Sequence, residues 1–208
     1  MPANYDNITT IYDFISRIVY GKSIVKAQVS LLKFIPPKSR LLIVGGGTGW
    51  VLEEIAKQHS TDLIIDYVES SAQMIAMSQK RNYGSNVIHF INLPIEQFEP
   101  DGLYDVILTP FLFDNFKEDK LEMVFTRLHA ALKSKGMWLY ADFEPINSNS
   151  LFWQKLLLKI MYLFFRITCG IETSELINIQ GYFASDFQIL FKSHFYADFI
   201  QAVAYQKK

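Results

Sequence analysis

The sequence predicts an α/β fold in which helices cover both faces of a doubly wound sheet of seven strands. Short aliphatic runs alternate with helical patterns over most of the chain, which is typical of parallel strands joined by crossover helices. The last two runs, 187–190 and 200–205, are joined by a short connection and predict an antiparallel hairpin at one edge. A glycine-rich loop at 45–49 follows the first run and indicates ligand binding at the carboxyl ends of the strands.

Each predicted element has a local cause. Short apolar runs bounded by turn residues predict the strands, which are expected at 41–44, 63–68, 87–91, 105–108, 137–140, 187–190 and 200–205. Apolar residues at helical spacing predict helices over 12–35, 50–58, 71–80 and 118–133. Gly21 interrupts the first helix and Pro36 ends it, because proline cannot extend the hydrogen-bond ladder. Lys135 and Gly136 predict a turn before the fifth strand.

Length and composition are those of one globular domain. The chain has 208 residues, half of them hydrophobic, enough to bury a sizeable core over 1–208. Within it we expect an N-terminal helical lid at 1–37 and a helical insertion on the substrate side at 150–182. The formal net charge of -1 gives no general attraction to nucleic acid.

Other features bear on location. Cys169 is the only cysteine, so no intrachain disulfide can form, which favours a reducing compartment. The apolar stretch 151–171 contains three basic residues and is too charged to span a bilayer, and 1–5 does not begin a secretory signal. A cytoplasmic protein is therefore expected.

The glycine loop carries the chemistry. Gly45, Gly47 and Gly49 allow positive φ and let a ligand approach the backbone at the start of the following helix. A dinucleotide fingerprint would have a further glycine where this chain has Trp50, which disfavours a pyrophosphate cofactor. Glu69 ends the second strand, the expected place for a carboxylate that accepts ribose hydroxyls.

These segments resemble those of the class I S-adenosylmethionine-dependent methyltransferases, over about residues 12–205. Residues 43–49 match the first motif of that family and 67–71 its second, while 104–109 and 135–140 resemble its fourth and fifth strands. The resemblance implies a Rossmann-like fold and S-adenosylmethionine as cofactor. The implied cofactor-binding residues are Gly45, Gly46, Gly47, Gly49, Glu69, Ser70, Met74, Pro94, Ile95 and Thr109.

Within that set, the resemblance implies individual roles. Gly45 and Gly47 would lie under the methionine part and Glu69 would hold the ribose, while Ser70 and Met74 would border the adenine. The family often places an acid beside the adenine amino group, but our alignment sets Pro94 there. Adenine would then depend on backbone groups near Ile95 and on apolar packing.

Two alternative functions remain open. The loop also resembles that of aminopropyltransferases such as spermidine synthase, but those enzymes have an aspartate where this chain has Thr109 and Pro110. The other alternative is a non-catalytic nucleoside-binding module, in which Tyr12 or Phe111 would fill the space above the sulfur.

The catalytic residues are not identified by a motif. Weak candidates are Asp142 and Asp114, which follow strands, and Tyr12, which lies with Tyr20 on the N-terminal segment. A helix cap or surface charge is the more common role for such aspartates, and core packing for such tyrosines.

No metal site is expected, because the four histidines show no ligand spacing. Apolar residues surround the helix expected at 151–165, which suggests a small hydrophobic acceptor, contact with a lipid surface or a dimer face, with a core helix as the structural alternative.

Overall fold

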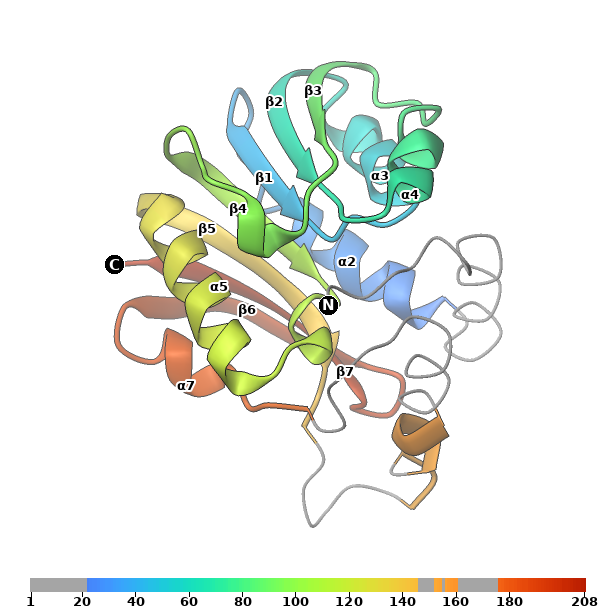
Figure 1. Ribbon diagram of the computed structural model, residues 1–208, viewed down its shortest axis with the longest axis vertical. Coiled ribbons are helices and arrows are strands. Elements are labelled where there is room, and N and C mark those ends of the chain that lie inside the picture. Colours follow the sequence, from blue (N-terminus) through green and yellow to red (C-terminus); the bar gives the residue numbers. More distant parts are fainter. Residues whose placement is uncertain (1–21, 146–151, 155, 161–175) are drawn as a thin grey trace.

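The structure is a computed structural model that describes residues 22–145, 152–154, 156–160 and 176–208. These residues form a sheet of order β3-β2-β1-β4-β5-β7-β6 with helices on both faces (Figure 1). The strands are β1 (Arg40–Val44), β2 (Thr61–Val68), β3 (Ser85–Ile91), β4 (Tyr104–Pro110), β5 (Leu132–Phe143), β6 (Phe187–Phe195) and β7 (Ile200–Lys207). The first five are parallel, and β7 runs antiparallel to both β5 and β6. The predicted doubly wound sheet with an edge hairpin is confirmed.

The helices also follow the predicted pattern. They are α2 (Ser23–Leu32), α3 (Trp50–Gln58), α4 (Ala72–Ser78), α5 (Glu118–Ala131) and α7 (Gln180–Phe183), with 3-10 turns η2 (Ile95–Gln97) and η3 (Phe113–Asn115). Residues 152–154 and 156–160 are helical as well. None of the helices in the described ranges is long and apolar enough to cross a bilayer.

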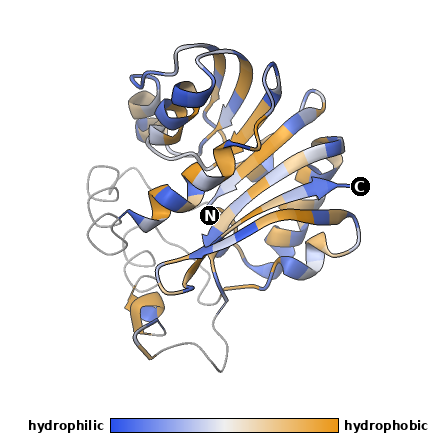
Figure 2. Cartoon of the chain, turned by 180° about the vertical axis from the view of Figure 1, so that it is seen from behind, coloured by the Kyte–Doolittle hydropathy of each residue, from blue (hydrophilic) through white to orange (hydrophobic). Residues whose placement is uncertain are grey.

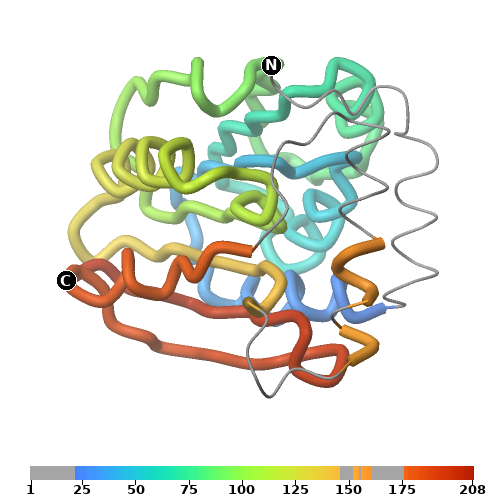
Figure 3. The backbone as a smooth tube through the Cα atoms, turned by 60° about the horizontal axis from the view of Figure 1, so that its bottom comes forward, coloured from blue at the N-terminus to red at the C-terminus, as the bar shows by residue number. Residues whose placement is uncertain are grey.

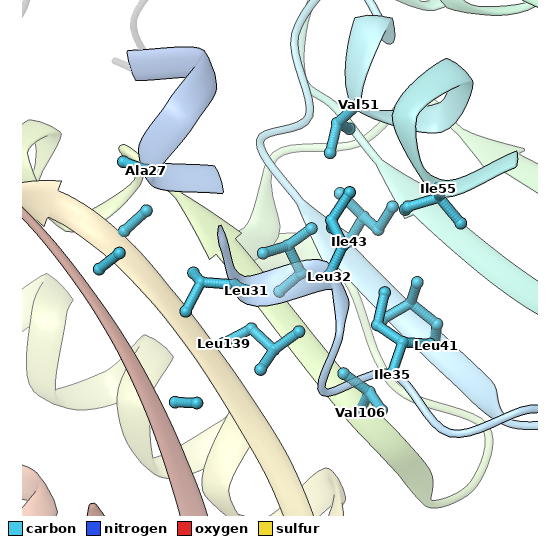
Figure 4. Packing of buried hydrophobic residues seen from close by; sticks show 14 of the residues in the cluster. Ala27, Leu31, Leu32, Ile35, Leu41, Ile43, Val51, Ile55, Val106 and Leu139 are labelled. Carbon is cyan, nitrogen blue, oxygen red and sulfur yellow. The ribbon is translucent and has the colours of Figure 1, made fainter. Parts of the chain in front are cut away.

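One face of the sheet is covered by α2 and α3. Leu31 and Leu32 of α2 are fully buried against strand residues such as Leu41 and Leu139 (Figure 4). Residues 22–37 of the segment predicted as a lid at 1–37 include core positions of this sheet face, and the lid itself stays a prediction. Residues 1–21, which include Tyr12 and Tyr20, lie outside the described residues.

The opposite face is covered by α5 and α7. Phe125 of α5 stacks on Trp138 of β5 and Phe183 of α7 meets it edge-on, with ring centroids 4.9 and 5.0 Å from the indole. The tube view shows α2 and α5 on opposite sides of β5 (Figure 3). Since residues alternate faces along a strand, odd-numbered β5 residues from Met137 onward meet the α2 side, and even-numbered ones meet the α5 side.

The turn predicted at 135–136 lies inside β5. Lys135 has a φ of 63°, and the register with β4 shifts between Tyr104 and Val106. The chain thus begins to pair with β4 directly after α5. Lys135 and Gly136 do not precede the strand but form a bulge within it.

Candidate functional site at the carboxyl edge of the sheet

The glycine loop joins β1 to α3 in a tight turn. Gly45, Gly47 and Gly49 have φ values of 73°, 63° and 79°, a region that residues with a Cβ seldom adopt. The Gly45 amide donates to the carbonyl of Val68, 2.9 Å away, which holds the turn against the end of β2. The three glycines are therefore required by backbone conformation.

Gly46 is required for a different reason. A Cβ at this position would overlap the ring of Tyr67, which lies under the loop. The Tyr67 hydroxyl donates to the carbonyl of Gly47 at 2.9 Å and fixes the loop from below. The resemblance implied Gly46 as a cofactor-binding residue, but the need for a glycine at this position comes from the Tyr67 ring on the neighbouring strand.

Glu69 lies beside the loop and is 6% exposed. Its Oε2 accepts the Gly47 amide at 3.0 Å, and its Oε1 accepts the Ser71 amide at 3.0 Å and the Ser70 hydroxyl at 3.3 Å. Burial raises the pKa of Glu69 above its usual value, although these hydrogen bonds oppose the shift. A carboxylate offers about four acceptor positions, so Glu69 keeps acceptor capacity for a hydroxyl.

Asn92 supports this corner and was not singled out by the sequence. Its Nδ2 donates to the carbonyls of Glu69 and Ser70 at 2.9 and 3.0 Å. Arg81, also missed, donates from Nε to the Thr48 carbonyl at 2.9 Å and braces the glycine loop from the segment after α4. An asparagine or arginine in a loop is too common a feature to have revealed either contact.

The residues expected around an adenine are arranged along the same edge. Met74 is buried, and its sulfur lies 3.9 Å from where a Cβ of Gly47 would be. Ser70 is exposed, Pro94 precedes η2, and Ile95 is buried. The structure thus brings Met74 to the loop and leaves Ser70 accessible.

The side chain of Thr109 is engaged in the core. Its side chain is fully buried, and its Oγ1 accepts a hydrogen bond from Trp138 Nε1 at 3.0 Å. The hydroxyl therefore belongs to the core on the α5 side, and only the backbone of Thr109 remains available at the strand end. The face of the sheet on which the Thr109 side chain lies decides this, and the sequence did not predict that face.

The segment after β4 crosses toward the glycine loop. Phe111 has a φ of 52°, an uncommon conformation for an aromatic residue, and its ring packs against Phe143 at 5.1 Å. Leu112 Cδ1 lies 3.3 Å from where a Cβ of Gly45 would be. Leu112, and not Phe111, is thus the described residue of this segment that meets Gly45.

Asp114 and Asp142 come together next to this segment. Asp142 is 1% exposed, and its carboxylate accepts the Phe113 amide at 3.2 Å and the Phe143 amide at 2.8 Å. Burial raises the pKa of Asp142, and burial together with the charge of Asp142 raises the pKa of Asp114 well above its usual value. The two candidate carboxyl groups therefore lie close enough for the charge of one to disfavour ionisation of the other, and they form an acidic pair.

Comparison with known families gives a match in the middle of the chain. Residues 41–136 match a family model described as a methyltransferase domain, which covers the glycine loop, Glu69 and β4.

Relatives with curated functions are distant. A polyamine aminopropyltransferase 2 from Bacillus anthracis is 28% identical over 152 residues, which are 65% of this chain and 40% of that protein. A ubiquinone/menaquinone biosynthesis C-methyltransferase from Geotalea daltonii is 27% identical over 136 residues, 64% of this chain and 53% of that protein. The chain spans about half the length, or less, of these relatives.

Solved structures share the fold at low identity. A mitomycin 7-O-methyltransferase matches with a TM-score of 0.70 and 14% identity, over 99% of this chain and 61% of the other. A magnesium protoporphyrin IX methyltransferase from Synechocystis, solved with bound S-adenosylhomocysteine, matches with a TM-score of 0.65 and 14% identity, over 98% and 97% of the two chains.

Proposed function

We propose that this chain, which belongs to the class I S-adenosylmethionine-dependent methyltransferase superfamily, binds S-adenosylmethionine at the glycine loop and transfers its methyl group to a small molecule. The observation that carries the proposal is the contact between Glu69 and the loop. A buried carboxylate at the end of the neighbouring strand accepts the amide of one of three positive-φ glycines, which supports a ribose-binding acceptor beside the loop.

The residues fit the cofactor that the family implies. Gly46 packs directly on the Tyr67 ring, and Gly45, Gly47 and Gly49 carry no side chain, so the turn offers bare backbone to an amino-acid nucleoside. Glu69 retains acceptor capacity for the ribose hydroxyls, and Met74 supplies an apolar wall next to Gly47. The cofactor supplies a methyl group activated by a positive sulfur, so the chain has mainly to align the acceptor, exclude water and accept a proton.

We propose further that the acceptor has an apolar body. Phe152, Leu156 and Ile160 expose 81%, 47% and 56% of their surface on the helical residues after β5. This segment is largely orange in the hydropathy view (Figure 2). In a position between the fifth and sixth strands, such side chains are suited to covering an apolar small molecule.

A calorimetric titration tests the cofactor assignment. We expect S-adenosylhomocysteine to bind and NAD not to bind, and Glu69→Ala to weaken binding by roughly 1.5–3 kcal/mol, since the lost hydrogen bonds involve a charged group. Glu99→Ala is the matched control, because the Glu99 side chain is 81% exposed on a surface loop. Binding of NAD alone would show that the assignment is wrong, and an unchanged affinity in Glu69→Ala would remove Glu69 from the site.

Aminopropyl transfer is the second candidate, because two Bacillus aminopropyltransferases are 28% and 26% identical to this chain over 65% and 73% of its length. It would use the decarboxylated form of the same cofactor. Formation of spermidine from putrescine and decarboxylated S-adenosylmethionine, with no methylated product from S-adenosylmethionine, would favour it over methyl transfer.

A further inference from the structure

Gln201 of β7 is a buried amide that the fold leaves unsatisfied. Its side chain is 0% exposed, and neither Oε1 nor Nε2 has a hydrogen-bond partner in the part of the chain that the structure describes. Leaving a buried polar group without a partner destabilises the fold. Such a group in a core strand calls for an explanation, such as an ordered water or a bound ligand.

The register of the sheet places Gln201 beside the acidic pair. Gln201 is paired directly with Asp142 across β5 and β7, and paired residues of antiparallel strands project from the same face about 5 Å apart. The face is the α5 side, since Tyr140 of β5 and Val203 of β7 are buried there. The unsatisfied amide and the buried carboxylate are therefore neighbours.

The charge around Gln201 is negative. Asp142 forms no salt bridge with a described residue, and Asp114 is close enough for the charge of Asp142 to raise its pKa. Glu144, the first residue after β5, has one carboxylate oxygen without a hydrogen-bond partner among the described residues, while its other oxygen lies 4.0 Å from Lys192 Nζ. The charged neighbours among the described residues are thus three carboxyl groups, with Lys192 near Glu144 and His194 paired with Gln201 across β6 and β7.

This cluster is connected to the glycine loop by one short segment. Leu112 meets Gly45, and the next residue, Phe113, donates its amide to Asp142. Asp114 follows and is less deeply buried than Asp142. Asp142 and Gln201 therefore lie one short segment away from the loop where the methyl donor is proposed to bind.

We propose that Gln201, Asp142 and Asp114 form the acceptor end of the site and that the acceptor is a small organic amine, bound as its ammonium ion. This presupposes the methyl-transfer function proposed above and names its substrate class. An ammonium group can donate to the Gln201 carbonyl oxygen and to the Asp142 carboxylate, and its charge offsets the repulsion between Asp142 and Asp114. A neutral alcohol would supply the hydrogen bonds but not the charge.

The acid pair also completes the reaction. One N–H proton of the ammonium ion passes to the carboxylate pair, which leaves a lone pair on nitrogen. That lone pair forms the N–C bond to the methyl group while the C–S bond breaks and its electrons remain on sulfur. The products are the methylated ammonium ion and neutral S-adenosylhomocysteine, and the proton leaves the pair for solvent.

Calorimetry with matched probes tests the proposal without requiring turnover. Benzylamine and its neutral isostere benzyl alcohol, together with putrescine, are titrated into the protein with and without S-adenosylhomocysteine. We expect an amine to bind at least about tenfold more tightly than the alcohol, and Gln201→Leu to weaken amine binding about tenfold or more. The same variant is expected to leave the dissociation constant of S-adenosylhomocysteine within about twofold.

A control separates binding from folding. Gln188→Leu makes the same change on β6 at an exposed glutamine that contacts Gln206, and it is expected to leave amine binding unchanged. Gln201→Leu is expected to remain folded with a melting temperature equal to or above that of the unaltered chain, because an apolar side chain replaces an unsatisfied amide. If that variant fails to fold, Asp142→Asn provides the same binding comparison.

The possible outcomes distinguish the two proposals. Amine binding that Gln201→Leu abolishes supports the acceptor site whether or not S-adenosylhomocysteine binds, and absence of nucleoside binding would overturn only the methyl-transfer function. Equal binding of the amines and the alcohol, no binding of any amine, or amine binding that Gln201→Leu leaves intact would each overturn the amine site.

Discussion

At the scale of single residues, the proposed cofactor site depends on positions that accept only one type of residue. Three glycines of the loop adopt positive φ, and Gly46 lies against the Tyr67 ring. Glu69 is held by two backbone amides on opposite sides of its carboxylate, so its orientation is fixed before any ligand arrives. Such preorganisation lowers the entropic cost of binding.

Gly46→Ala is expected to destabilise the protein by roughly 1–3 kcal/mol, because the new methyl group would force Tyr67 or the loop to move. Gly181→Ala is the matched control, since a Cβ there meets nothing within 4 Å, and we expect it to change stability by less than about 1 kcal/mol. Urea denaturation measures both. Equal stability of the two variants would show that the Tyr67 contact does not constrain the loop.

The raised pKa of Glu69 predicts how cofactor binding depends on pH. Protonation removes the acceptor that the ribose hydroxyls need, and it begins at a higher pH than for an ordinary glutamate because burial raises the pKa. The affinity for S-adenosylhomocysteine is therefore expected to fall as the pH is lowered through that raised pKa, and Glu69→Gln is expected to lessen this dependence. Calorimetry between pH 4.5 and 8 gives the comparison, and an identical pH profile for both proteins would contradict it.

At the scale of elements, a polar network joins four adjacent strands. Asp66 of β2 is 3% exposed and accepts hydrogen bonds from Arg40 of β1 at 2.8 Å and Tyr104 of β4 at 2.7 Å. The Nδ1 atom of His89 on β3 lies 2.7 Å from its other oxygen. Burial alone would raise the pKa of Asp66, but hydrogen bonds from Tyr104, His89 and Arg40 lower it overall. The network therefore fixes the lateral order of the strands beneath the site.

Asp66→Asn is expected to destabilise the chain by roughly 1–3 kcal/mol at pH 7, because hydrogen bonds to a charged group are lost. A lowered folded-state pKa stabilises the fold above the unfolded pKa, and this stability is lost as the pH falls through the folded pKa. Denaturation series at several pH values should thus show a weaker loss toward acid in Asp66→Asn. Asp101→Asn changes an 80% exposed aspartate and serves as the control, with an expected effect below about 1 kcal/mol.

At the scale of the whole molecule, the acidic pair is a place where stability and proposed function oppose each other. The fold brings Asp114 after β4 next to Asp142 at the end of β5, and both pKa values are raised. A raised pKa means that the pair stabilises the fold below the unfolded pKa, and that this stability is lost as the pH rises through the folded pKa. At neutral pH the pair therefore costs stability, which a bound cation would restore.

Asp114→Asn is expected to raise the melting temperature at pH 7 by a few degrees, since it removes the repulsion at a cost of about 1 kcal/mol or less in other contacts. The gain in melting temperature should shrink toward pH 4, because protonation of the carboxyl groups removes the repulsion from the unaltered chain as well. Differential scanning calorimetry at pH 7 and pH 4 measures the effect. A lower melting temperature at pH 7 would mean that Asp114 stabilises the fold by contacts that outweigh the repulsion.

The sequence by itself determined the order of strands and helices, the hairpin at the sheet edge and the glycine loop with Glu69, because these depend on local periodicity and on backbone conformations that glycine permits. Only the tertiary structure decided that Thr109 belongs to the core, that Asn92 braces Glu69 and that Gln201 lies beside Asp142. These depend on the register and face of strands distant in the chain, and a shift of one residue would turn every side chain of a strand to the other face.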